Sequence, residues 1–309
     1  MGYDSKWDDS TWKAYTHAHV DGKTADKIFT SRSLPEEFDP ALINLRESRD
    51  SDISPQSTSI SLFLDVTGSM GMLAETMMRD GLNTTATELM KRAPVSDPQI
   101  MLGAVGDAET DTAPLQLTQW ESSTVLAEQT RRLYIEGRGG ANAGESYMLP
   151  HVFHAFKTET DCWSKRRKKG FLVTIGDEPT LDGVTRSQAK RFLGIDLQSD
   201  LSAADCIALA SERYEILHVV VAQGSGCSGS RRERVIAQWN SLLPQRVLIL
   251  DDHTKLAETI VSAIQVIEGA SKSDVSASWG DRSTSLVVAS AVSSLAERAT
   301  AKGIRRIGR

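Results

Sequence analysis

The strongest constraint on the fold is the alternation of short apolar runs with longer amphipathic segments between residues 57 and 270. Nearly continuous apolar runs, typical of strands buried on both faces, occupy 59–66, 170–176 and 215–222, and further strands are expected at 99–105 and 246–250. The intervening segments favour helices at 70–92, 122–136, 151–156, 201–214, 232–243 and 253–269. Strands that alternate with helices in this way form right-handed βαβ units and a parallel sheet.

The predicted fold class is therefore α/β: a doubly wound, mostly parallel, Rossmann-like sheet with helices on both faces. The three most hydrophobic strands are expected at its centre. The segment 114–120 follows its predecessor after a short turn, which predicts an antiparallel edge strand. Residues 1–56 are expected to be an N-terminal extension whose aromatic rings pack on the core. Residues 57–270 form the domain, and 271–309 a linker followed by an amphipathic helix from Leu286.

Composition excludes several classes of function. A net charge of −6 argues against bulk electrostatic binding to nucleic acid or to anionic lipid. No apolar stretch approaches the roughly 20 residues that a membrane span needs. The three cysteines are few and spaced unlike a zinc site or a disulfide framework. A cytoplasmic protein in a reducing compartment is expected, and its oligomeric state is not indicated.

The most informative motif is FLDVTGSM, residues 63–70. A buried strand ends in Asp65, and Thr67 and Ser69 follow at alternate positions, so one carboxylate and two hydroxyls point the same way beyond the strand. Oxygen ligands of this kind suit a hard cation such as Mg²⁺ or Mn²⁺. The alternative is that these side chains cap the helix that follows, because Ser and Thr are good N-caps.

The segment Asp65-Val66-Thr67-Gly68-Ser69-Met70 resembles the metal-ion-dependent adhesion site of von Willebrand factor A domains, whose first loop reads Asp-x-Ser/Thr-x-Ser. The order of strands and helices over roughly 57–269 is also similar to that family. The resemblance implies a domain that holds Mg²⁺ and binds another protein, whose Asp or Glu carboxylate becomes the last ligand of the cation. It implies no enzymatic turnover.

Two further loops of the family pattern have counterparts here. The glycine-rich second loop corresponds to Gly139-Gly140-Ala141, but Ala141 stands where the family has a metal-binding Thr, so a water or one of three nearby side chains is expected to take that place: Asn142, Glu145 or Ser146. The third loop brings an Asp after the fourth strand, and Asp177 is the natural candidate with Glu178 in reserve. An acidic turn containing Asp107 leaves the second strand and is expected nearby.

An enzyme is the main alternative. Asp65-Val66-Thr67-Gly68-Ser69 is also similar to the phosphorylated loop of haloacid-dehalogenase-type phosphohydrolases, with Asp65 as the nucleophile. Gly176-Asp177 with Asp182 would then correspond to the magnesium motif, and Lys168 or Lys169 to the phosphate-stabilising lysine. Against this, Val66 and Thr67 occupy positions where that family needs a lysine or an acid.

Two other features carry weaker signals. His151 and His154 lie one helical turn apart, but no cluster of carboxylates or thiols joins them, so a zinc site is not favoured. The basic run 165–169 precedes a buried strand and is expected to be a solvated loop rather than a nucleic-acid patch.

Overall fold

The computed structural model describes residues 7–136 and 144–297, and its centre is a six-stranded sheet. The strand order is β10-β9-β6-β2-β3-β4, the order of a doubly wound α/β fold. The strands are β2 (Thr58–Asp65), β3 (Pro98–Val105), β4 (Leu115–Leu117), β6 (Gly170–Gly176), β9 (Tyr214–Val221) and β10 (Val247–Leu250). All neighbours pair in parallel except β4, which is antiparallel to β3. The predicted fold class and the antiparallel edge strand are confirmed.

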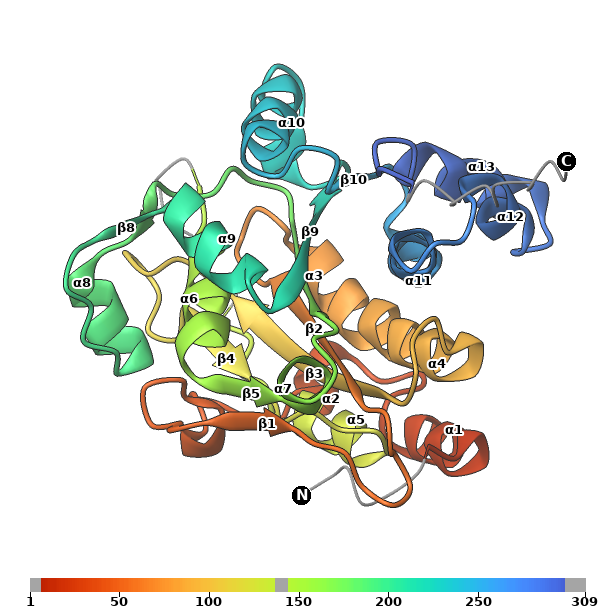
Figure 1. Cartoon of the computed structure of the whole chain (residues 1–309), viewed down its shortest axis with the longest axis horizontal. Helices are drawn as coiled ribbons and strands as arrows, with labels where there is room; N and C mark the ends of the chain where they lie inside the picture. The colour runs from red at the N-terminus through yellow and green to blue at the C-terminus, as the bar shows by residue number, and fades with distance from the viewer. Residues whose placement is uncertain (1–6, 137–143, 298–309) are drawn as a thin grey trace, which may run out of the picture.

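Helices cover both faces of this sheet (Figure 1). On one face, α4 (Leu82–Arg92) and α11 (Leu256–Ile267) pack on each other and on the strands. On the other face lie α6 (Met148–Phe156) and α9 (Ala203–Ser211), with α10 (Arg231–Leu242) beside β9 and β10. β2 has every residue buried, as a strand with helices on both sides requires. The carboxyl ends of β2, β3, β6 and β9 therefore meet at one edge.

The helix predicted over residues 70–92 is interrupted. The structure has a short helix α3 (Met72–Thr76), a π-helical turn η3 (Met77–Gly81) and then α4. At Gly81 an added Cβ would lie 3.2 Å from the Leu256 side chain, so α11 approaches closely where the wide turn ends. The periodicity located the helical segment but did not indicate this change in winding. The segment predicted as a helix over 122–136 is regular only in α5 (Val125–Thr130).

The N-terminal segment lies against the domain. It contains α1 (Asp9–His19), α2 (Ala25–Ile28), the 3₁₀ turn η2 (Glu36–Phe38) and β1 (Arg46–Ser48). Trp12 is only 3% exposed, within the hydrophobic core on the α4–α11 side, and Trp7 packs on it. β1 pairs in parallel with β5 (Thr158–Thr160), forming a small sheet apart from the main one.

The C-terminal segment corrects one expectation. Residues 271–285 were predicted to form a linker, but they contain α12 (Lys272–Ala277), and the next helix, α13 (Arg282–Ala291), begins before Leu286. Ser271 and Asp281 cap the two helices by accepting backbone N–H bonds, which the sequence pattern did not reveal. Val275 and Val288 are buried, so this Ser- and Ala-rich segment is folded against the domain.

An insertion that the sequence did not predict lies between β6 and α9. A two-stranded antiparallel ribbon pairs β7 (Gly183–Val184) with β8 (Leu201–Ser202), and α8 (Arg186–Gln188) and the π-helical turn η4 (Ala189–Leu193) connect them. In Figure 1 this insertion projects at the side of the molecule that carries α6 and α9.

The basic run 165–169 is used within the fold. Lys165 and Arg166 pair with Asp50, and Lys168 pairs with Glu268. The run is nevertheless a loop, as expected from the sequence, in which Lys165 and Arg167 are exposed to solvent. Across residues 7–136 and 144–297, no helix combines the length and the apolar character that a membrane span requires.

Candidate metal-binding site

The candidate site lies at the edge of the sheet where the parallel strands end, and Asp65 is its innermost group. The Asp65 side chain is fully buried at the end of β2. Its Oδ1 accepts hydrogen bonds from the backbone N–H of Thr67 (2.8 Å) and from the Thr67 hydroxyl (2.6 Å). The sharp turn after the strand therefore holds Thr67 directly over the carboxylate.

Ser69 joins this loop to the third predicted loop. Its hydroxyl donates to Asp177 Oδ1 over 2.7 Å and lies 3.3 Å from the Thr67 hydroxyl. Asp65, Thr67, Ser69 and Asp177 thus form one connected chain of oxygen atoms, as the motif predicts. The helix-capping alternative is wrong, because α3 begins after Gly71 and has no side-chain cap.

A fourth loop, which the sequence reading did not include, closes around Asp177. It follows β9, and its Gly226 N–H donates to Asp177 Oδ2 over 2.6 Å. Ser225 donates both its N–H (3.1 Å) and its hydroxyl (2.8 Å) to the Ser69 carbonyl. A Cβ added at Gly224 would lie 2.3 Å from Asp177 Oδ2, so this glycine permits the close approach. The sequence signal was Gly224-Ser225-Gly226 directly after an apolar strand.

Tyr147 is a second residue that the sequence reading missed. Its hydroxyl, fully buried, donates to Asp65 Oδ2 over 2.5 Å. A Cβ added at Gly176 would lie 1.9 Å from that hydroxyl, so the glycine at the end of β6 makes room for the ring. Oδ1 of Asp65 is therefore held from within the motif by Thr67, and Oδ2 from outside it by Tyr147.

Glu145 is buried beside the same carboxylates. It is 3% exposed, and its Oε2 has no hydrogen-bond partner. Its backbone bonds to Pro179 and Leu181, which ties the second loop to the third. Ser146 points elsewhere: its hydroxyl accepts the Ala108 N–H over 2.9 Å. Gly139, Gly140, Ala141 and Asn142 lie outside the described residues.

The remaining two candidates lie around this centre. Asp107 is fully buried and accepts hydrogen bonds from the Glu109 N–H and the Thr110 hydroxyl, so it organises its own turn. Glu178 is half-buried, and Trp239 donates its indole N–H to the Glu178 carbonyl (3.0 Å). Neither has a hydrogen bond to Asp65 or Asp177, although both lie close enough to influence the site electrostatically.

The carboxylates of Asp65, Glu145 and Asp177 lie close enough together to affect one another's pKa. Burial raises the pKa of Asp65, and the Asp177 carboxylate raises it further. Burial, followed by the charges of Asp65 and Glu178, raises the pKa of Glu145. Burial also raises the pKa of Asp177, while the hydrogen bonds from Ser69 and Gly226 and, after them, the charge of Arg231 lower it. Within the described parts of the chain, no Lys or Arg nitrogen lies within 4.0 Å of these three carboxylates.

This donor set fits a hard divalent cation. It consists only of carboxylate and hydroxyl oxygens, one buried carboxylate oxygen lacks any partner, and the carboxylates repel one another without a paired cation. In the part of the chain that the structure describes, no group of three or more His, Cys, Asp or Glu side chains is arranged to hold a metal. A cation here would therefore depend on the hydroxyls of Thr67 and Ser69 as well as on Asp65 and Asp177.

The histidines do not take part. His151 and His154 are fully buried, and each bonds through Nδ1 to a carbonyl one turn earlier in the chain. His154 Nε2 contacts the Ser61 hydroxyl over 2.9 Å. They belong to the core beneath the site, together with His218, which stacks on Trp239.

Comparison with known proteins adds little beyond the fold. No protein-family model matches the chain, and no curated protein matches its sequence. Among solved structures, the pilus adhesin SpaC from Lactobacillus rhamnosus GG in its open conformation is similar over 72% of this chain and 31% of its own, with 9% identity and a TM-score of 0.47. A von Willebrand factor type A protein from Catenulispora acidiphila is similar over 71% of this chain and 44% of its own, with 14% identity and a TM-score of 0.38.

The domain is von Willebrand factor A-like in fold. That statement rests on the strand order, the antiparallel β4 and the placement of Asp65 at the end of the first core strand. The chain spans less than half the length of either similar structure, and at these identities and TM-scores the matches say nothing about what this chain binds.

Proposed function

We propose that this chain is a binding module that holds Mg²⁺ or Mn²⁺ at Asp65, Thr67, Ser69 and Asp177 and uses the cation to recruit another protein through a carboxylate. The observation that carries the proposal is the continuous chain of hydrogen bonds through these four residues, with the unpartnered Glu145 oxygen beside it. A bound cation would supply the positive charge that the buried carboxylates lack.

Two carboxylates set the charge of the proposed site. Asp177 lies in the same chain of contacts as Asp65, so these two groups would balance the charge of a divalent ion. A partner's carboxylate would then be held by direct coordination at the half-exposed Ser69 side rather than by long-range attraction.

The partner therefore needs to reach the metal from the side where Ser69 and Gly68 are accessible. The fully buried Asp65, Tyr147 and Asp177 form the inner wall and orient the ligands. None of them needs to move a proton or form a covalent bond for binding to occur. The proposed role of the chain is recognition without turnover.

The test is hydration of bound Mn²⁺. Mn²⁺ is titrated into the protein while the relaxation rate of water protons is measured, which reports how many waters the ion keeps. Binding is expected to be lost in Asp65→Ala and in Ser69→Ala, and a glutamate-containing peptide is expected to lower the number of waters on the bound ion. No Mn²⁺ binding by the wild type, or unchanged hydration with millimolar peptide, would contradict the proposal.

The positions of Lys168 and Lys169 do not favour the phosphohydrolase alternative. Lys168 and Lys169 lie at the start of β6, whereas Asp65 and Asp177 follow the opposite ends of their strands. Lys168 pairs with Glu268, and Lys169 donates to the Ser211 carbonyl.

A further inference from the structure

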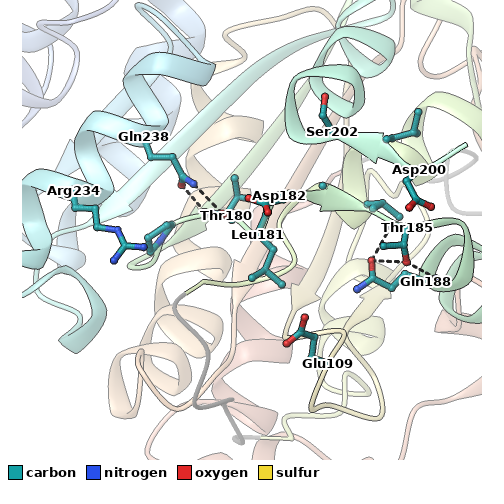
Figure 2. A pocket seen from close by; sticks show the side chains of 14 residues that line it. Glu109, Thr180, Leu181, Asp182, Thr185, Gln188, Asp200, Ser202, Arg234 and Gln238 are labelled. Carbon is teal, nitrogen blue, oxygen red and sulfur yellow. Dashed lines mark hydrogen bonds between the residues drawn. The ribbon is translucent and has the colours of Figure 1, made fainter.

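A cavity of about 580 Å³ opens beside the candidate metal site. Figure 2 shows Arg234 and Gln238 of α10 on one side of it, the β7–β8 insertion with Asp200 and Ser202 on the other, and Asp182 between them. Glu109 lines it from the loop that follows β3. The volume lies within the range of pockets that hold small ligands or single side chains.

The walls of this cavity are held in place by backbone contacts. The Gln238 side-chain amide donates to the Thr180 carbonyl (3.0 Å) and accepts the Thr180 N–H (2.9 Å), so α10 is clamped to the segment that follows Asp177 (Figure 2). The Asp182 carbonyl accepts the Ala203 N–H over 2.7 Å. The Asp182 carboxylate itself is exposed. The cavity is therefore formed by fixed backbone with a charged group at its surface.

The cavity is continuous in sequence with the proposed metal site through one loop. Pro179, a lining residue, is two residues after Asp177. Two peptide units span at most about 8 Å between Cα atoms. A partner segment that places a carboxylate at the metal can therefore place a neighbouring side chain in this cavity.

The lining charges decide the kind of side chain. Among the lining residues that the structure describes, the carboxylates of Asp182 and Asp200 face the guanidinium of Arg234, a formal sum of −1 for these three side chains. The Asp200 carboxylate accepts the Arg186 N–H over 2.7 Å, which fixes its position without neutralising it. Arg186 directs its own Nε to the Leu197 carbonyl. A cationic side chain with a long apolar stem matches this lining.

We infer that the cavity receives a Lys or Arg side chain of the partner, within about three residues of the carboxylate that binds the metal. The proximity of this side chain to a metal-bound carboxylate rests on the proposed function. The choice of a cationic side chain for the cavity does not. The recognised segment thus carries one acidic and one basic residue, and the cavity decides which acidic segments the module accepts. Specificity comes from the insertion between β6 and α9, not from the metal.

The experiment uses the full chain and short peptides of the form acetyl-Glu-(Gly)n-Lys-Gly-amide, with n from zero to two, together with the reversed order of Glu and Lys. A Gln replaces Lys in each matched control peptide. Binding to ¹⁵N-labelled protein is followed by amide chemical shifts in 5 mM Mg²⁺ and in EDTA. The Lys peptide is expected to bind about three- to ten-fold more tightly than the Gln peptide, and the difference is expected to shrink in 0.5 M NaCl.

The variant Asp182→Asn combined with Asp200→Asn is expected to abolish this preference for Lys. Asn at position 200 can still accept the Arg186 N–H, so the contact between this residue and the start of α8 is kept. Glu212→Gln, which removes one exposed charge outside the cavity, is the matched control and is expected to leave the preference unchanged.

Each outcome decides a separate question. Equal affinities of the Lys and Gln peptides, with binding that still requires Mg²⁺, would overturn the cavity assignment and leave the proposed function standing. Absence of any effect of Mg²⁺ would overturn the proposed function. In that case, Lys-dependent shifts at Leu181, Val184 and Ser202 in EDTA would still support the cavity assignment, and their absence would overturn it.

Discussion

Asp65→Asn is predicted to be more stable than the wild type without Mg²⁺ and less stable than the wild type with Mg²⁺. Asp65 is fully buried, and burial and the Asp177 carboxylate raise its pKa, so the ionised form destabilises the metal-free fold. Asn has nearly the same shape and can still accept both hydrogen bonds from Thr67. Its amide can donate to the Tyr147 hydroxyl, which then accepts.

Removing the buried charge raises the free energy of unfolding, and losing the bound cation lowers it by a similar amount. Removing an incompletely compensated buried charge stabilises the metal-free protein by on the order of 1–3 kcal/mol. A cation present at a hundredfold excess over its Kd stabilises the wild type by about 2.7 kcal/mol. A chain of 309 residues has an unfolding entropy of about 0.6 kcal/mol/K, so this linkage raises Tm by about 4 °C. The raised pKa of Asp65 also sets how its contribution to stability changes with pH. The folded state binds the Asp65 proton more tightly than the unfolded state does, so this contribution in the metal-free wild type is lost as pH rises above the ordinary pKa of Asp.

The assay is calorimetric unfolding at pH 7.5 in EDTA and in 10 mM Mg²⁺. The Asn variant is expected to melt above the wild type in EDTA and below it in Mg²⁺. Asp196→Asn, an exposed carboxylate paired with Lys190, serves as the control and should show the full Mg²⁺ shift. If Asp65→Asn keeps that shift, Asp65 is not a ligand. If the variant melts below the wild type in EDTA, the buried carboxylate does not destabilise the fold.

Two further predictions concern the surroundings of the site. Gly176→Ala places a methyl group on the Tyr147 hydroxyl, so it should lower the free energy of unfolding by about 1–3 kcal/mol in urea denaturation; an unchanged midpoint would contradict the packing described. Three buried histidines should make stability fall as pH drops below about 6.5, because burial lowers their pKa: to about 4 for His151, to about 3 for His154, and well below 6.5 for His218. Each contributes up to about 1.4 kcal/mol per pH unit near pH 5, while the raised pKa of Asp65 and of Glu145 acts in the opposite direction. In urea denaturation with Mg²⁺ present, His154→Gln is therefore expected to lose about 1 kcal/mol less stability than the wild type between pH 6 and pH 5, and equal losses would refute this.

The sheet and the core of the site could be predicted because both follow from short-range patterns. Apolar runs located the five parallel strands of the central sheet, and a short turn indicated the antiparallel one. Because the carboxyl ends of parallel strands meet at one edge, Asp65 and Asp177 had to come close together. The alternation of Thr67 and Ser69 after Asp65 was enough to place both hydroxyls beside the carboxylates.

Other features of the site depended on contacts between distant segments. Tyr147 reaches Asp65 only because Gly176, on another strand, leaves space for its ring. Gly226 binds Asp177 across 49 positions of the chain, and glycine and serine after a strand are too common to indicate such a contact. The strands β7 and β8 of the insertion are two residues long each, too short for a periodic pattern in the sequence to reveal them. Whether Glu145 replaces the ligand missing at Ala141 stays a prediction.

The helices at the end of the described chain protect an open border of the sheet. β10 is the last strand, and an edge strand exposes backbone groups that can pair with another chain. Here α13 packs against β10, and the Ser294 hydroxyl donates to the Val247 carbonyl. At the opposite border, β4 has only three residues, too short to template pairing. Removing the segment from Ser271 onward would therefore expose β10 as a surface for self-association, so the integrity of this segment bears on whether the chain stays dispersed at high concentration.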